Sequence, residues 1–247
     1  MARGGGCAPG GSLRHLGRGA GRAGEPHDEG PGTRSPGLVA QEKTLVAAER
    51  DEAARECWRA AAAGLDPADL VFVDECGTHV ALTPLYAWAP RGERARGVVP
   101  RNRGQNLTLV AALTAAGCEA AMTIGGAVDA AAFAAYVREI LVPTLRPGQT
   151  VILDNLSVHK GAAIRALVEG AGCALLFLPP YAPDFNPIEL AFGKLKAPLR
   201  RAEARTRATL EAAIGTALAR FTPDDIRAWF VYSGYLPPPA PCNLSAS

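Results

Sequence analysis

Three acidic residues stand in sequence contexts suited to binding metal ions. Asp74 follows the apolar run 70–73 and Asp154 follows 151–153, so each aspartate ends a predicted buried strand. Ligands of open α/β sheets usually bind at the carboxyl ends of the strands, and adjacent parallel strands would bring the two aspartates together. Glu189 lies in the first turn of a predicted helix. Three convergent carboxylates suit phosphoryl transfer with two metal ions about 3.5–4 Å apart, and oxygen ligands favour Mg²⁺ or Mn²⁺.

Each of these acids also has a plainer explanation. An aspartate after a strand commonly starts a turn or caps the next segment. Asn186, Pro187 and Glu189 stand at the N-cap, first and third positions of the predicted helix, which is the arrangement of a capping box. The residues alone leave the catalytic and the capping role of Glu189 open.

The elements that must position these acids follow from the hydrophobic pattern. Strands are predicted over 70–74, 107–113, 119–124, 151–154 and 174–178, and helices over 42–63, 129–145, 160–170, from 186 onward and over 211–221. The first three strands form a meander with a long Pro/Gly/Arg-rich insertion over 83–104. Pro198 is expected to kink or end its helix.

The two ends of the chain differ in composition from this middle part. Residues 1–40 contain twelve glycines and four prolines, and their five arginines and three acids account for the net charge of +2. We expect a disordered tail over 1–41, one catalytic domain over 42–235 and a loose tail over 236–247. The rest of the chain is neutral overall, so any basic surface depends on how its charges are arranged.

The sequence has few features of a cysteine-metal protein, a secreted or membrane protein, or a serine hydrolase. The six cysteines have no metal-ligand spacing, and we expect them to be reduced and mostly buried. There is no signal peptide and no apolar run of about 18 residues, which predicts a soluble, cytoplasmic, nucleoid-associated protein without membrane contact. The absence of a G-x-S-x-G motif argues against a serine hydrolase.

Three blocks in a fixed order carry a resemblance to a known family. They are DE at 74–75, DN-x-x-x-HK at 154–160 and LPPY-x-P-x-x-NP-x-E at 178–189. The chain resembles, from about residue 42 to 235, the bacterial insertion-sequence branch of the mariner superfamily of transposases. That branch typically has the 34-residue separation found here between the second and third acids.

The resemblance implies a fold, a metal site and an activity. The fold would be ribonuclease-H-like, a mixed five-stranded α/β sheet with a three-strand meander, then alternating helices and strands, and helices on both faces. Asp74, Asp154 and Glu189 would hold two Mg²⁺ or Mn²⁺ ions. The domain would cleave DNA strands at the ends of an insertion sequence and join them to target DNA, as a homodimer bound to double-stranded DNA.

One departure from the family leaves alternatives open. Full-length members carry helix-turn-helix modules before the catalytic domain, where this chain has the Gly/Arg-rich tail. The DNA-reading part is then a separately encoded subunit, or the reading frame is truncated or frame-shifted. The alternative functions are an inactive DNA-binding remnant and a ribonuclease-H-like nuclease without strand transfer.

Several neighbours of the acids receive secondary roles. Glu75 should point to the opposite strand face from Asp74, as a structural partner rather than a metal ligand. Asn155 and His159 either contact the scissile DNA or satisfy loop backbone. Asp184 is interpreted as a turn residue.

Two basic stretches flank the acids in sequence. Between 194 and 207, six basic residues face one acid, for a charge of +5: Lys194, Lys196, Arg200, Arg201, Arg205 and Arg207 against Glu203. The insertion holds five arginines and one acid: Arg91, Arg94, Arg96, Arg101 and Arg103 against Glu93. Such runs are usually solvated faces, but phosphate contacts supply most nonspecific affinity for DNA. We predict DNA contacts from Arg101, Arg103, Lys194, Lys196, Arg200 and Arg201.

Overall fold

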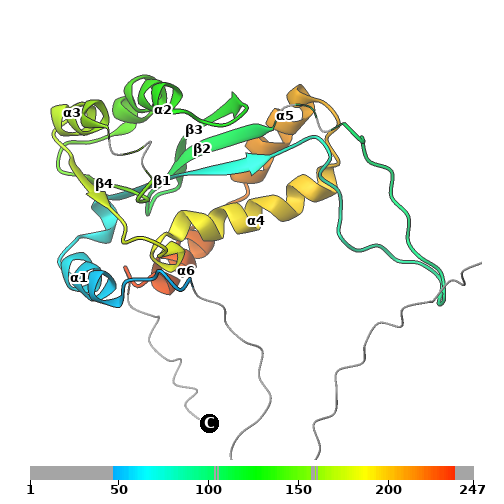
Figure 1. Ribbon diagram of the computed structural model, residues 1–247, viewed down its shortest axis with the longest axis horizontal. Coiled ribbons are helices and arrows are strands. Elements are labelled where there is room, and N and C mark those ends of the chain that lie inside the picture. The colour runs from blue at the N-terminus through cyan, green and yellow to red at the C-terminus, as the bar shows by residue number, and fades with distance from the viewer. Residues whose placement is uncertain (1–46, 103, 105, 157–158, 160, 237–247) are drawn as a thin grey trace, which may run out of the picture. The chain divides into compact units, whose positions relative to one another are not determined.

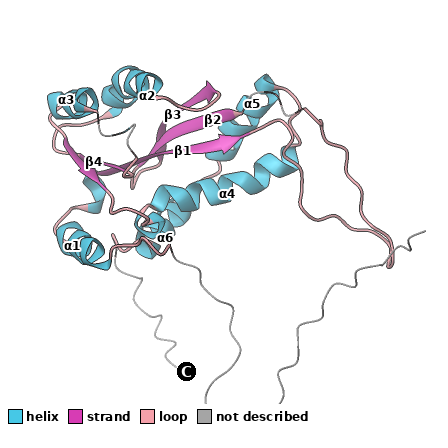
Figure 2. Cartoon of the chain, in the orientation of Figure 1, coloured by secondary structure: helices cyan, strands magenta, loops and turns pink. Residues whose placement is uncertain are grey.

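The computed structural model describes residues 47–236 except 103, 105, 157, 158 and 160. This part contains one five-stranded sheet in the order β3-β2-β1-β4-β5, with helices around it (Figures 1 and 2). The strands are β1 Leu70–Thr78, β2 Leu107–Leu113, β3 Cys118–Gly125, β4 Thr150–Leu153 and β5 Ala174–Phe177. The helices are α1 Glu52–Ala62, α2 Ala130–Tyr136, α3 Ala162–Gly170, α4 Pro187–Ala202, α5 Arg207–Leu218 and α6 Pro223–Tyr232. The predicted fold class, a mixed sheet with a meander followed by alternating helices and strands, is confirmed.

The sheet changes from antiparallel to parallel at β1. β1 pairs antiparallel with β2 as far as Thr78, whereas its parallel pairing with β4 stops at Val73 opposite Leu153. The prediction that the first strand ends at Asp74 is therefore wrong, because pairing with β2 continues beyond it. Asp74 and Asp154 nevertheless each follow the last parallel pair, which places them side by side at one edge of the parallel ladder.

Helices cover both faces of the sheet, and the alternating side chains of β1 supply both cores. Phe72 packs in a core with buried residues of α4, α5 and α6. Val71 and Val73 belong to the opposite core, with buried residues of α2 and α3. Figure 1 shows α2 and α3 on one side of the sheet and α4 and α6 on the other. The first carboxylate thus stands on a strand that is fixed from both faces.

Two predicted helices have different bounds in the structure. α1 begins at Glu52, where Asp51 accepts a capping hydrogen bond from the backbone of Ala54 at 3.0 Å; residues 42–46 lie outside the described part. Asp129 caps α2 as predicted. That helix ends at Tyr136 and continues as a π-helical and a 3₁₀ turn, because Pro143 cannot donate the hydrogen bond that would extend it.

Three features of the C-terminal helices differ from the predictions. α4 continues through Pro198 to Ala202, because Leu195 and Leu199 are buried on either side of the proline and hold the helix to the core. α6 was not predicted; Thr222 caps it, and its apolar residues are spaced for one buried face. α5 begins earlier than predicted, at Arg207 after its own cap.

The remaining sequence predictions concern cysteines, membranes and tails. No disulfide occurs in the described part, where Cys76 and Cys173 are buried, Cys118 is partly buried and Cys57 is exposed. Among the described residues, no helix combines the length and apolar character needed to span a membrane. The predicted tail 1–41 lies outside the described residues, and so does the predicted tail 236–247 apart from Leu236.

Candidate active site

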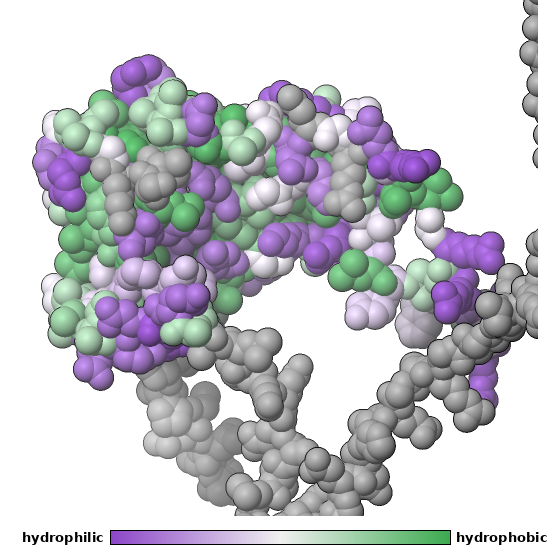
Figure 3. Space-filling view, viewed as in Figure 1, coloured by the Kyte–Doolittle hydropathy of each residue, from purple (hydrophilic) through white to green (hydrophobic). Residues whose placement is uncertain are grey.

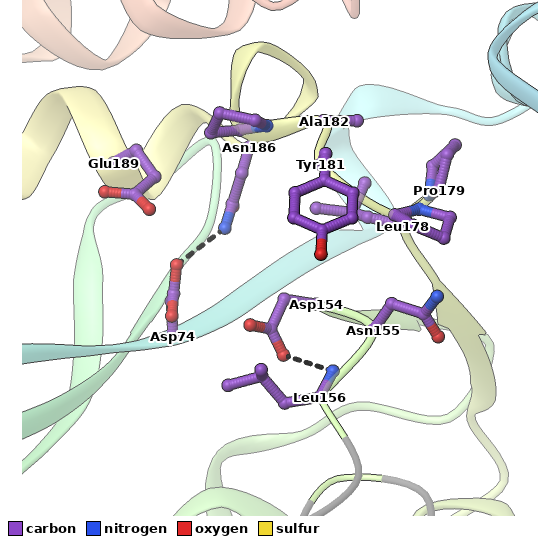
Figure 4. A pocket seen from close by; sticks show the side chains of 12 residues that line it. Asp74, Asp154, Asn155, Leu156, Leu178, Pro179, Tyr181, Ala182, Asn186 and Glu189 are labelled. Carbon is purple, nitrogen blue, oxygen red and sulfur yellow. Dashed lines mark hydrogen bonds between the residues drawn. The ribbon is translucent and has the colours of Figure 1, made fainter. Parts of the chain in front are cut away.

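Asp74, Asp154 and Glu189 line one pocket with a volume of about 400 Å³. Asp74 comes from β1, Asp154 directly follows β4, and Glu189 stands in the first turn of α4. Figure 4 shows the three carboxyl groups around the same hollow, with Tyr181 and Asn186 on its rim. The structure therefore brings three acids that are distant in sequence to one pocket.

The capping-box explanation of Glu189 does not hold in the structure. The side chain of Asn186 makes no capping hydrogen bond to α4. In a capping box, the carboxylate of Glu189 would accept a hydrogen bond from the backbone N–H of Asn186. That N–H instead donates to the carbonyl oxygen of Pro183 at 3.0 Å. The carboxylate of Glu189 instead lies on the side of α4 that faces Asp74 (Figure 4).

Asn186 contacts the first aspartate directly. Its Nδ2 donates to Oδ2 of Asp74 at 2.8 Å, and the residue is only 3% exposed. Its Oδ1 is buried and has no hydrogen-bond partner among the described residues. An unpaired buried oxygen is unfavourable unless a ligand, ion or water satisfies it. The sequence assigned Asn186 only to the helix cap.

The electrostatics of the pocket disfavour its own negative charges. Burial is the main cause that raises the pKa of Asp74 to about 7, and the charges of Glu189 and Asp154 raise it further. The backbone N–H of Glu75, which donates to Oδ1 of Asp74 at 2.7 Å, acts in the opposite direction. A bound cation would relieve this repulsion.

These residues fit a hard divalent cation. The donor set consists of carboxylate oxygens together with the unpaired amide oxygen of Asn186, which are the ligands that Mg²⁺ and Mn²⁺ accept. Within the described ranges, no three His, Cys, Asp or Glu side chains surround a single point closely enough to hold an ion. The carboxylates therefore line the walls of the pocket without closing on one centre.

His159 has a role that neither sequence interpretation foresaw. Its Nδ1 lies 2.5 Å from Oδ1 of Asp154 and its Nε2 lies 3.0 Å from Oε1 of Glu75. Burial lowers the pKa of His159, but the hydrogen bonds and charges of the two carboxylates outweigh it and raise the pKa to about 9. The side chain is fully buried. The prediction that it contacts DNA is wrong for this conformation, because no surface of the ring is accessible.

The other neighbours divide between the pocket and the interior. Asn155 lines the pocket and is partly exposed, so a contact with DNA stays a prediction for it. Glu75 is paired with His159 and is not among the residues that line the pocket, in agreement with the expectation that it points to the opposite face.

Asp184 is an ion-pair partner as well as a turn residue. It lies in the 3₁₀ turn Pro183–Phe185, and its carboxylate accepts two hydrogen bonds from the guanidinium of Arg55, at 2.9 and 2.5 Å. Arg55 is buried in α1 and its guanidinium also lies 4.1 Å from the ring centre of Phe185. Sequence reasoning missed this ion pair, because nothing in the pattern of α1 distinguishes the buried Arg55 from the exposed Arg59 one turn later.

The basic stretch at 194–207 is only partly free to bind an anion. Lys194 forms an ion pair with Asp225 of α6. Arg205 donates to the carbonyls of Val80 and Leu82, which holds the start of the insertion. Arg207 pairs with Glu211 within α5. Of the six basic residues in this stretch, Lys196, Arg200 and Arg201 form no ion pair with another described residue.

The insertion after β1 exposes both charged and apolar side chains. Arg101 is exposed, and Arg103 lies outside the described residues. Tyr86 and Trp88 are almost completely exposed. In the space-filling view, hydrophobic groups appear beside hydrophilic ones where this connection between β1 and β2 leaves the sheet (Figure 3).

Solved structures of Mos1 transposase have the same fold as this chain. The Mos1 strand transfer complex matches with a TM-score of 0.60 and 17% identity, over 80% of this chain and 64% of that chain. The mariner Mos1 paired end complex with Mg matches with a TM-score of 0.61 and 16% identity, over 80% and 64%. The catalytic domain of Mos1 mariner transposase matches with a TM-score of 0.51 and 14% identity, over 74% and 86%.

The extent of these matches shows which part is shared. This chain spans slightly less than two thirds of the Mos1 chains in the two complexes, but most of the isolated catalytic domain. No curated protein matches the chain. The family model described as DDE superfamily endonuclease matches residues 69–211, which is more than half of the sequence and includes all three acids of the pocket. The chain therefore belongs to the DDE superfamily endonucleases.

Proposed function

We propose that this chain is the catalytic domain of a transposase that cleaves DNA strands at the ends of a bacterial insertion sequence and joins them to target DNA. The observation that carries the proposal is the shared pocket of Asp74, Asp154 and Glu189. Burial, together with the charges of Glu189 and Asp154, raises the pKa of Asp74, and a bound divalent cation would stabilise its charged form.

The chain's own residues have distinct parts in this reaction. Asp74, Asp154 and Glu189 would hold two Mg²⁺ or Mn²⁺ ions. When bound, such ions activate the attacking oxygen and stabilise the leaving oxygen of a phosphodiester. Asn186 holds Asp74 by its amide and keeps a free oxygen beside the pocket. Asn155, on the pocket wall, is placed to contact the strand being cut.

DNA would lie across the pocket and along the free cations of α4. Lys196 follows Glu189 by two helical turns, and the charges of both residues act on the thiol of Cys76, so both lie toward the same part of β1. Arg200 and Arg201 extend this cationic row, and Arg101 supplies charge from the insertion. We expect the working form to be a dimer bound to DNA, and the solved Mos1 transposase paired-end complex with left transposon end is in keeping with this.

The test is metal-dependent nicking of supercoiled plasmid by the full chain, with Mg²⁺, with Mn²⁺ and with chelator. The wild type should nick only with metal, and Asp154→Asn should abolish the reaction, whereas the matched control Glu169→Gln on the surface of α3 should not change it. Joining is measured separately, by incubating a labelled pre-cut DNA end with a target plasmid.

The alternatives predict different results in the same assays. Salt-sensitive DNA binding without nicking at any metal concentration would identify a catalytically inactive remnant. Metal-dependent cutting of branched or hybrid substrates without joining would identify a ribonuclease-H-like nuclease. Nicking that survives Asp154→Asn would overturn the assignment of the site.

A further inference from the structure

We infer that Glu75 and His159 form a positioning pair that orients the carboxylate of Asp154 so that only one of its oxygens faces the metal pocket. This inference rests on the proposed function, because the pair matters only if Asp154 binds a metal ion. It adds two positioning residues to the three acids, and neither of them touches the substrate.

The pair connects the two strands that carry the aspartates. Asp74 and Glu75 are consecutive on β1, so their side chains leave opposite faces of the sheet. Asp74 enters the pocket, while Glu75 reaches His159, which in turn reaches Asp154 beyond the end of β4. The imidazole therefore ties the second carboxylate to the strand of the first.

His159 is held too firmly to leave this position easily. Its side chain has no exposed surface, and its ring lies 4.2 Å from the ring of Phe133 in α2, tilted by 38°. Both ring nitrogens face a carboxylate oxygen, so each can donate a hydrogen bond only when the ring carries both protons. A ring fixed on both sides and packed on one face has a single orientation.

The hydrogen bonds of Asp154 show what this orientation achieves. Its Oδ1 accepts from His159 at 2.5 Å and from the backbone N–H of Leu156 at 3.1 Å. Its Oδ2 takes part in no hydrogen bond within the described part of the chain, and Asp154 lines the pocket. One oxygen is thus committed to the protein, which leaves the other for a cation.

The pair should therefore contribute to metal affinity without being a ligand. Residues that orient a metal ligand typically change metal affinity by about 10–100-fold when they are removed. We expect a loss in this range for His159→Ala and for Glu75→Ala. His159→Asn keeps a donor within reach of Asp154 and should retain more affinity than His159→Ala. Glu75→Gln keeps an acceptor for the imidazole and should be the mildest change.

The experiment is titration of Mn²⁺ into the full chain by calorimetry, together with thermal unfolding with and without metal. The single variants of the pair, Glu75→Ala and His159→Ala, are also combined in a double mutant. If Glu75 acts through His159, the double mutant binds Mn²⁺ no more weakly than His159→Ala alone. Glu169→Gln is the control, as an exposed acid whose partner Arg165 is also exposed.

Several results would overturn the pair. Unchanged Mn²⁺ affinity in Glu75→Ala and His159→Ala, with Asp154→Asn weakening it, would refute the pair and leave the proposed function intact. Additive losses would show that Glu75 acts independently of His159. If His159→Ala bound DNA more weakly but Mn²⁺ as tightly as the wild type, His159 would be a DNA-contacting residue and not a positioning residue. If the wild type bound no Mn²⁺, the proposed function and the pair would both fail. Should His159→Ala not fold, the comparison of Glu75→Ala with Glu75→Gln decides the question: a loss of Mn²⁺ affinity in the first that the second largely spares supports the pair, and unchanged affinity in both refutes it.

Discussion

The side-chain amide of Asn186 lies 2.8 Å from Asp74 and donates to it, although Asn186 stands at the N-cap of α4. The two residues are 112 positions apart in sequence, and both are buried. The contact ties the first helical turn of α4, which carries Glu189, to the strand that carries Asp74. Two of the three acids are therefore held in one rigid unit.

Asn186→Ala should destabilise the protein and weaken metal binding. It removes the hydrogen bond of a buried carboxylate oxygen, which costs about 1–3 kcal/mol when no other partner replaces it. Urea unfolding without metal measures this loss. Asn186→Asp is the informative comparison, because it adds a charge to the pocket and should be rescued by Mn²⁺ more strongly than the wild type. Equal stability of Asn186→Ala and the wild type would show that the contact contributes nothing.

Glu189→Gln should leave the stability of the metal-free protein within about 0.5 kcal/mol of the wild type. The reason is that Glu189 does not cap α4, so the helix does not depend on its charge at that position. The same change should abolish the rise in melting temperature that Mn²⁺ produces. A destabilisation of about 1 kcal/mol without metal, which is typical of removing a cap, would contradict this and favour the capping role.

Asp184→Asn should destabilise the protein more than Arg55→Leu does. Arg55 is 1% exposed and would remain buried without its partner, whereas Asp184 is 42% exposed and can be solvated when Arg55 is removed. A buried charge that loses its hydrogen bonds costs about 1–3 kcal/mol or more. Urea unfolding of both variants at pH 7 gives the order, and the reverse order would show that the carboxylate is the more demanding partner.

The ion pair of Arg55 and Asp184 should make the stability of the protein depend on pH below pH 6. The hydrogen bond from Arg55 is the main cause that lowers the pKa of Asp184 below its ordinary value of 3.8. A carboxyl with a depressed folded pKa contributes stability that is present above its unfolded pKa and is lost as the pH falls through the folded value. From pH 6 to pH 3, the wild type should therefore lose more stability than Asp184→Asn. If the free energies of unfolding of the two proteins fell equally between pH 6 and pH 3, the prediction would be contradicted.

Replacing the free cations of α4 by glutamine should weaken DNA binding at low salt. For every phosphate that the variant no longer neutralises, the slope of log affinity against log salt should become shallower by about 0.9. The set is Lys196, Arg200 and Arg201, tested singly and together by fluorescence anisotropy with a labelled duplex. Arg146→Gln is the control, because Arg146 stands before the start of β4, at the opposite end of the strand from the pocket. An equal effect of the control would indicate a general charge effect rather than a DNA path.

The sequence by itself determined the order of the five strands and of the helices as far as α5, and it singled out the three acids. Apolar runs long enough to bury a strand have one simple interpretation, so the runs before Asp74 and Asp154 could be recognised without a structure. β2 has the bounds that were predicted, and the cap at Asp129 is where it was expected. The signal was weaker for α6, whose ten residues mix charged and aromatic side chains.

Only the tertiary structure decided which side chains meet. The capping and catalytic roles of Glu189 involve the same local pattern, and they differ only in what lies opposite the helix. Asn186 with Asp74, His159 with Glu75 and Arg55 with Asp184 are pairs far apart in sequence. No local period encodes such contacts, because they depend on strand register and on how helices pack against the sheet. The arrangement of strands therefore turns isolated polar residues into a single candidate site.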